Sequence, residues 1–424
     1  MSEVTSVTSR RILVVTPQPF YQDRGTPIAL VNTCRALGQL GFEVDLLAFP
    51  VGQDTIMPAV NIQRCANPFG IRVVPIGFSV RKVLLDLTLA CSFWHLLRTR
   101  DYRAVHAVEE AAYLAAMFCP RRRTPFVYDM ASAIPVELRR HEILGTGLAQ
   151  RAVGAFERLA LRHASQVICS IGLAEHVRAV APEARFTEWR FPPLTDTADE
   201  ASVRRLREEL DIPATAHVVG YTGSFAAYQR LDLLFEAFAE ALAVDPQLML
   251  VCVGASAGMR AAALARFSPP ARARVRILPP EPRDRMPGYL AMADCLISLR
   301  PSSDNLPLKV LDYMAAGRPI VATRGRAHEP VLNGERAFLC EARTDSVKQA
   351  ILEVFSSPQR ARAVAGAARS HALQYYGWDR FIEQIEGLYG NISALHPRSE
   401  PLQVRLPATA RSARDAGSAR QGHA

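Results

Sequence analysis

The chain has 424 residues, 49% of them hydrophobic, and 50 basic against 41 acidic side chains give it a formal net charge of +9. This length and composition indicate a globular protein of two or three domains, each able to bury its own core. The positive charge suits a phosphate-bearing ligand or an anionic membrane surface. The sequence has no basic run interleaved with aromatic residues, which argues against nucleic acid as a partner.

The eight cysteines are scattered without a CxxC pair or a His/Cys cluster, so the sequence indicates neither a zinc site nor a disulfide framework. The amino-terminal residues are polar and are followed by only a short apolar run, which is too little for a signal peptide. Reduced thiols then favour the cytoplasm as the compartment.

In chain order, the first half alternates apolar strands with amphipathic helices. A helix is predicted at residues 28–40, after a turn-rich loop at 17–27. Strands are predicted at residues 11–15, 43–49, 104–108, 125–130 and 166–170. Strands that alternate with helices form a mostly parallel sheet covered on both faces, so we expect one doubly wound domain over residues 1–195.

Residues 83–97 are the most hydrophobic stretch, but Asp86 and His95 interrupt it and it is too short to span a bilayer. It predicts either a buried helix or a helix that faces a membrane. Basic residues surround this stretch: Arg81, Lys82, Arg98, Arg100, Arg103 and Arg121–Arg123. These residues suit contact with the inner membrane surface. The alternative explanation is a solvated surface beside a buried helix.

The second half repeats the rhythm of the first. Strands are predicted at residues 217–223, 248–254, 274–279, 294–301 and 319–323, with a helix at 231–242. Proline and charge increase near 192–205, which places a domain boundary there. The second doubly wound domain is expected over residues 205–377, a further helix over 378–392, and a disordered basic tail over 395–424.

In each half, a glycine-containing turn follows the first strand. Gly25 allows close approach of a ligand to the backbone at a helix start, where free amides receive anions, although a plain strand-to-helix turn explains it equally well. Gly223 and Ser224 are its counterparts in the second half and offer donors to a phosphate, with Arg230 just beyond. Neither turn has the GxGxxG spacing, which argues against a nicotinamide or flavin enzyme.

Three polar residues close to strand ends in the first half are candidates for the acceptor side of a site. His106 is a catalyst or a structural histidine, and the sequence leaves both open. Glu109 follows the same strand. Asp129 either orients an acceptor hydroxyl or caps the next helix. No Ser/His/Asp order stands out, so hydrolysis by such a triad has no support.

The stretch SSDNLPLKVLDYMAAGRPIVAT, residues 302–323, carries the strongest signal. Asp304 lies in a loop and Asp312 in the helix that follows, with Lys309 one turn away on roughly the same face. Ordinary surface pairing would explain these residues, but the segment follows a strand of the second sheet. The acids therefore lie at the carboxyl edge of that sheet, where open α/β sheets bind ligands.

These motifs resemble those of the retaining GT-B glycosyltransferases of family 4. The resemblance rests on RILVVTPQPFYQDRGTPIALVNTCRALGQLGFEVDLL, on GYTGSFAAYQRLDLLFEAFAEA and above all on DNLPLKVLDYMAAGRPIVAT, and it spans roughly residues 10–392. Family members carry two acids separated by seven residues at this place, as Asp304 and Asp312 are. The resemblance implies two Rossmann-like α/β domains that face each other across a cleft.

It also implies site roles and a reaction. Asp304 would contact the hydroxyls of the donor sugar and Asp312 those of the ribose, while the amides of Asn305 and Leu306 would lie near the diphosphate. Lys309 and Arg230 would be the cations, supported by the amides of Gly25 and Gly223. The chain would be a hexosyltransferase that uses a nucleoside diphosphate sugar and keeps the anomeric configuration, with neither metal nor cofactor. A polysaccharide or lipid-linked glycan would be the acceptor.

The chain departs from the family pattern at three places. Gln229-Arg230 stands where many members have Lys-Gly, Ala131 where they often have histidine, and both motif acids are aspartate instead of glutamate. These departures keep open a nucleotide-sugar-binding scaffold whose catalytic site has eroded. A GT-B-fold nucleotide-sugar epimerase is the other alternative, although it needs a cluster of acid/base residues that the sequence does not show.

Overall fold

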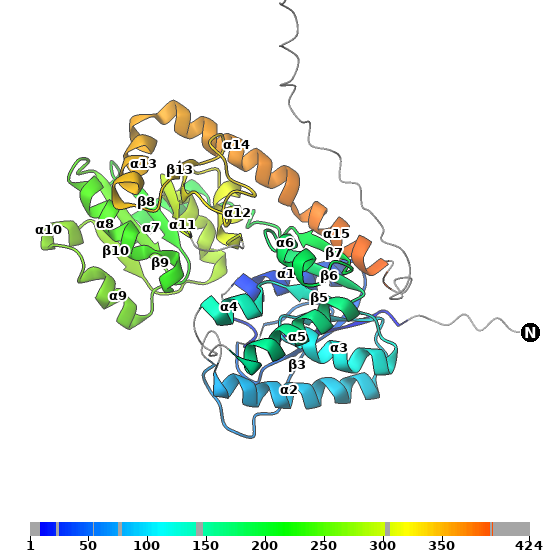
Figure 1. Cartoon of the computed structure of the whole chain (residues 1–424). Helices are drawn as coiled ribbons and strands as arrows, with labels where there is room; N and C mark the ends of the chain where they lie inside the picture. Colours follow the sequence, from blue (N-terminus) through cyan, green and yellow to red (C-terminus); the bar gives the residue numbers. More distant parts are fainter. Residues whose placement is uncertain are drawn as a thin grey trace, which may run out of the picture.

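The computed structural model describes residues 9–22, 25–53, 55–74, 79–140, 147–301, 306–390 and 392. It contains two α/β domains that lie side by side, as Figure 1 shows. The expected fold class, with two doubly wound parallel sheets, is confirmed. The tail at 395–424 lies outside the described residues.

The first domain is built on a seven-stranded parallel sheet with the strand order β3-β2-β1-β4-β5-β6-β7. Its central strands are buried on both faces, as parallel strands between helix layers must be. The strands are β1 (Arg11–Val15), β2 (Glu43–Ala48), β3 (Val60–Arg64), β4 (Ala104–Val108), β5 (Phe126–Met130), β6 (Gln166–Ser170) and β7 (Phe186–Trp189).

Helices cover both faces of this sheet. One face packs on α2, α3 and α5, and the other on α1 and α15. The helices of this part of the chain are α1 (Gly25–Gln39), α2 (Val80–Thr99), α3 (Ala111–Arg122), α4 (Ile134–Arg140), α5 (Leu148–His163) and α6 (Ala174–Val180). The helix expected at 28–40 begins three residues earlier, at Gly25.

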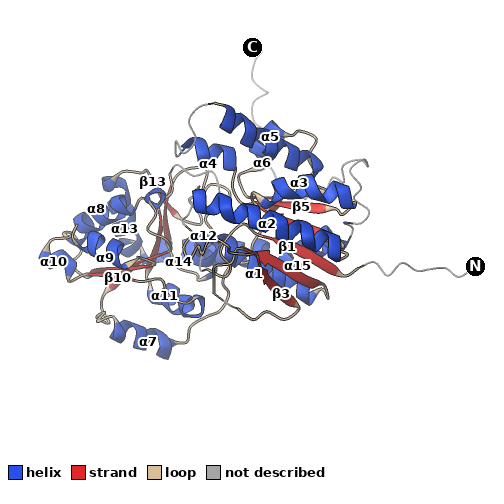
Figure 2. Cartoon of the chain, turned by 90° about the horizontal axis from the view of Figure 1, so that it is seen from below, coloured by secondary structure: helices blue, strands red, loops and turns tan. Residues whose placement is uncertain are grey.

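The second domain holds a six-stranded parallel sheet in the order β10-β9-β8-β11-β12-β13. Figure 2 shows helices on both sides of the strands in each domain. The strands are β8 (His217–Thr222), β9 (Leu248–Val253), β10 (Val275–Leu278), β11 (Cys295–Ser298), β12 (Ile320–Thr323) and β13 (Phe338–Cys340).

The remaining helices follow the first domain's last strand, and all but α15 belong to the second domain. They are α7 (Glu200–Glu209), η1 (Ala227–Gln229), α8 (Leu231–Leu242), α9 (Ala257–Leu264), α10 (Pro269–Arg272), η2 (Arg283–Arg285), α11 (Met286–Met292), α12 (Leu308–Ala315), α13 (Thr344–Ser356), α14 (Pro358–Tyr376) and α15 (Trp378–Gly390). None of the helices in the described ranges is long and apolar enough to cross a membrane.

The last helix, α15, returns to the first domain. Figure 1 shows α14 running from the second domain toward α15, which lies on the first. Phe381, Ile385 and Tyr389 of α15 are buried in the same cluster as Ile12 and Val14 of β1. The two domains also meet through single residues: Ile171 of the first domain packs into the core of the second, and Leu308 packs against the core of the first.

Candidate functional site

Two glycines shape the carboxyl edge of the second sheet. Gly223 and Gly254 follow β8 and β9 with φ angles of +129° and +120°, which L side chains rarely adopt. A Cβ atom on Gly254 would lie 2.2 Å from the carbonyl oxygen of Gly223. The two turns therefore pack backbone against backbone, and the edge stays free of side chains at this place.

Lys309, in the first turn of α12, reaches this glycine edge. Its ammonium lies 3.9 Å from the centroid of the Tyr221 ring and donates to Oε1 of Gln229 at 2.9 Å. A Cβ atom on Gly223 would lie 3.5 Å from the same ammonium. Burial and the positive charge of Arg300 both lower the pKa of Lys309 well below its ordinary value. The structure thus brings Lys309 and Gly223 together.

Asp312, one turn after Lys309, faces the chain between the domains. Its Oδ1 accepts a hydrogen bond from the Leu194 amide at 2.6 Å, and the Arg283 guanidinium lies 3.9 Å away. Burial raises the pKa of the Asp312 carboxyl, and Arg283 opposes that shift. Asp312 therefore fixes the interdomain segment to the second domain, and its contact with a ribose stays a prediction.

Asp304 and Asn305 lie outside the described residues. Leu306 is buried in the second core, and the Ser224 side chain is exposed while its carbonyl accepts from the Tyr221 hydroxyl at 2.6 Å. Gly25, at the start of α1, lies opposite α12, because a Cβ atom there would be 4.0 Å from Cδ1 of Leu308. Gly25 and Gly223, from the two domains, therefore both lie next to α12, which carries Asp312.

Arg230 has different contacts. Its Nε donates to both carboxylate oxygens of Asp232 at 3.2 Å, and its backbone has a φ of +50°. It borders a surface hollow of about 430 Å³ that is also lined by Phe225, Ala226, Ala227, Leu231 and Asp232. Within the described part of the chain no contact joins Arg230 to Lys309, so its catalytic role stays a prediction.

On the first sheet, His106 is fully buried and both of its ring nitrogens have partners. Nδ1 lies 2.6 Å from the hydroxyl of Tyr389 in α15, and Nε2 lies 3.1 Å from Oδ2 of Asp129. These contacts favour the structural interpretation of His106. Asp129 is engaged with this histidine and does not cap the next helix with that oxygen.

A second polar cluster lies at the carboxyl edge of the first sheet. Glu109, just after β4, accepts from the Ser132 hydroxyl at 3.2 Å, and burial raises its pKa well above the ordinary value. Lys82 pairs with Glu110, which ties the start of α2 to the same edge. Burial and the Glu110 charge raise the pKa of Asp86 to about 7. This cluster was not predicted from the sequence; Asp86 within the apolar stretch 83–97 was the available signal, but its partners could not be read from the sequence.

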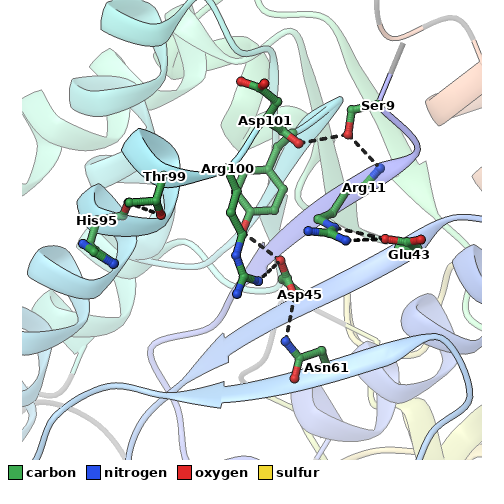
Figure 3. A network of polar contacts seen from close by, with 10 residues as sticks. Ser9, Arg11, Glu43, Asp45, Asn61, His95, Thr99, Arg100 and Asp101 are labelled. Atoms are coloured by element: carbon green, nitrogen blue, oxygen red, sulfur yellow. Dashed lines mark hydrogen bonds and ion pairs between the residues drawn. The ribbon is translucent and has the colours of Figure 1, made fainter. Parts of the chain in front are cut away.

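A surface hollow of about 540 Å³ lies at the opposite edge of the first sheet. Figure 3 shows its polar groups: Arg11 pairs with Glu43, and Asp45 accepts from Arg100 at 2.7 Å and from Asn61 at 2.9 Å. Because these charges neutralise one another and the ligand-binding edge lies elsewhere, we do not assign the site to this hollow.

Several arginines and lysines expected around the 83–97 helix have internal partners instead. Arg100 binds Asp45, Lys82 binds Glu110, and the Arg103 guanidinium donates to the carbonyls of Tyr389 and Gly390 at 3.3 and 3.0 Å. These three residues therefore have partners within the protein, and contact of the basic residues with a membrane stays a prediction. In the described ranges, no group of three or more His, Cys, Asp or Glu side chains is placed to hold a metal ion.

Comparison with known proteins agrees with this geometry. The model of the glycosyl transferase 4-like domain matches residues 24–185, and that of the glycosyl transferases group 1 matches residues 216–357. A D-inositol 3-phosphate glycosyltransferase of Rhodococcus jostii is 29% identical over 48% of this chain and 44% of its own length. That of Streptosporangium roseum is 28% identical over 93% of this chain and 97% of its own length. The chain spans about half the length of the first curated relatives, between 44% and 54%.

Solved structures match nearly the whole chain in fold. HepE of Anabaena, solved in complex with UDP and glucose, has a TM-score of 0.69 at 17% identity and covers 90% of this chain and 99% of its own. Sucrose-phosphate synthase of Thermosynechococcus elongatus has a TM-score of 0.71 at 19% identity, with 91% and 100% covered. With both of its domains matched by the family models and its two-sheet architecture shared with these structures, the chain belongs to the GT-B glycosyltransferases of the family 4, or group 1, type.

Proposed function

We propose that the chain transfers a hexose from a nucleoside diphosphate sugar to a polysaccharide or lipid-linked glycan acceptor. The observation that carries the proposal is the Lys309 ammonium beside the side-chain-free turn at Gly223, opposite the amino end of α1 at Gly25. A cation, bare backbone and a helix amino terminus together suit a diphosphate. The naming of relatives as D-inositol 3-phosphate glycosyltransferases and the UDP and glucose bound by HepE support this choice.

We further propose that the anomeric configuration is retained. In this reaction the bond between the anomeric carbon and the diphosphate oxygen breaks, and the acceptor oxygen bonds to the same face. The acceptor's proton passes to the departing diphosphate, so no protein nucleophile is needed. The chain's own residues hold the pose and neutralise negative charge as it develops on the leaving group. A metal-free mechanism of this kind stays a prediction.

The outer face of α2 supports a peripheral membrane contact on the acceptor domain. Val80, Val83 and Leu87 lie three and four residues apart on this face and are 73%, 41% and 61% exposed. Arg81 and Arg98 are exposed on the same helix. An exposed apolar stripe with flanking arginines suits an anionic bilayer surface, at which a lipid-linked acceptor would be met.

The first test is a thermal-shift screen of the purified chain against UDP-, GDP-, dTDP- and ADP-sugars, with Asp312→Asn and Asp312→Ala alongside. Asparagine keeps the oxygen that binds the Leu194 amide, whereas alanine removes it. A donor that stabilises the wild type but not Asp312→Asn would support the ribose contact. The absence of a shift with every donor would contradict the proposed function.

The products then separate the alternatives. Sugar transfer to an added glycan or lipid-linked acceptor, with release of the nucleoside diphosphate, is the expected result. Binding of the donor without turnover would favour the scaffold, and release of the nucleoside diphosphate without any acceptor would favour an epimerase. Proton NMR of the product reports whether the anomeric configuration is retained.

A further inference from the structure

A second cation lies at the same sheet edge as Lys309. Arg300 comes two residues after β11 and is held there because its backbone N–H donates to Oγ1 of Thr323 at 3.0 Å. Its guanidinium carbon lies 4.9 Å from the centroid of the Tyr228 ring. Sequence spacing gave no sign of this residue, because Tyr228 comes from η1, far away in the chain.

Each cation of this pair lies on an aromatic face. Lys309 lies over Tyr221, from β8, and Arg300 over Tyr228, from η1. Rings in this position attract a cation and fix its direction. In the residues that the structure describes, no carboxylate forms an ion pair with Lys309, whose hydrogen-bond partner is the neutral amide of Gln229.

Two positive side chains at one edge repel each other. Burial is the main cause of the lowered pKa of Lys309 and of His328, which is about 4; Arg300 adds to the first shift, and both cations add to the second. A neutral His328 then accepts from the Ser298 hydroxyl and donates to the Thr323 carbonyl, at 2.9 and 2.7 Å, and so joins the ends of β11 and β12. An anion between the cations would turn their repulsion into attraction.

We infer that Arg300 and Lys309, mounted on Tyr228 and Tyr221, form a two-cation clamp for the diphosphate of the donor. The inference rests on the proposed function and extends it to residues outside the Gln229-Arg230 pair. Gln229 occupies the position where many family members have lysine, and here it binds the Lys309 ammonium instead. Arg300, after β11, and Lys309, in α12, thus supply the positive charge that position 229 lacks. Tyr228 and Tyr221 act as positioning residues.

The clamp is tested by isothermal titration of the full chain with inorganic pyrophosphate, with UDP, GDP, dTDP and ADP, and with the matching nucleosides. Arg300→Gln and Lys309→Gln should each weaken binding of pyrophosphate and of the bound diphosphate roughly 10- to 100-fold. Binding of the nucleoside should not change. Arg266→Gln removes the same charge from a surface ion pair with Glu236 and serves as the matched control.

Two further variants separate a binding role from a structural one. Tyr228→Phe keeps the ring and should bind like the wild type, whereas Tyr228→Leu should weaken pyrophosphate binding. Arg300→Lys keeps the positive charge and so serves as a control for misfolding of Arg300→Gln. The thermal midpoint of each variant is a second control for misfolding. If the wild type binds none of the nucleoside diphosphates, the proposed function fails. If it binds one and Arg300→Gln binds it as well as Arg266→Gln does, the clamp is refuted.

Discussion

The hydroxyl of Tyr389, near the end of α15, lies 2.6 Å from Nδ1 of His106 in β4, and the ring of this histidine contacts Asp129 through its other nitrogen. All three side chains are buried. A hydrogen-bonded chain of this kind joins α15 to the central strands of the first sheet. It also explains why His106 is kept away from solvent.

Replacing Tyr389 by phenylalanine tests this connection. The ring would still fill its place in the core, but Nδ1 of the buried His106 would lose its partner. We expect a loss of about 1–3 kcal/mol in the free energy of unfolding, measured by urea denaturation. Tyr375→Phe, at a half-exposed position on α14, is the matched control. Equal stability of both variants would show that the hydrogen bond contributes nothing.

Asp86 should make the first domain less stable as the pH rises. Its pKa is raised from 3.8 to about 7 in the folded protein by burial and by Glu110, although Lys82 opposes the shift. Between these values the folded state holds a proton that the unfolded state has lost, so the stability conferred by Asp86 declines from about pH 4 to about pH 7. Asp86→Asn should flatten that decline and unfold later than the wild type at pH 7.5. A wild-type stability that rises over this range, with no change in the variant, would contradict the shift.

The Arg230→Gly variant should be more stable than the Arg230→Ala variant. Its φ of +50° is unfavourable for a residue with a Cβ atom, by about 1 kcal/mol. Both substitutions remove the exposed ion pair with Asp232, so the difference between them isolates the backbone. We expect Arg230→Gly to melt a few degrees above Arg230→Ala. Identical midpoints would show that the turn relaxes when arginine is removed.

The exposed stripe of α2 should control binding to vesicles. Leu87→Glu places a charge among Val80, Val83 and the acyl boundary, so co-sedimentation with phosphatidylglycerol vesicles should fall severalfold. Val244→Glu makes a comparable change at a 65% exposed position of the second domain and should sediment like the wild type. If the wild-type protein does not co-sediment with the vesicles, the proposal of membrane contact is refuted.

The central strands of both sheets follow from the sequence, because strands buried on both faces are continuous apolar runs. RILVV and AVHAV are buried almost throughout, and their predicted bounds match the structure. The edge strands β3 and β7 were missed. Their sequences, VNIQR and FTEW, are mixed in polarity, and only pairing with β2 and β6 makes them strands.

The site was predictable only where the chemistry is local in the sequence. Spacing alone brought Lys309 and Asp312 to one helix at the edge of the second sheet. Arg300 was missed because its position depends on Tyr228 in another segment. The partners of Arg100 and Arg103 could not be read for the same reason, since Asp45 and the carbonyls at the end of α15 are distant in the chain.

The return of α15 has a consequence for how the protein is made. Ile12 and Val14 leave the ribosome before the second domain is made, but Phe381 and Ile385, which pack in the same cluster, are synthesised after it. One apolar face of the first sheet is therefore covered only in part, by α1, while the whole second domain is translated. The nascent chain carries its aggregation hazard in the domain that is finished first, and a chaperone that shields this face would have to release it before the last helix docks.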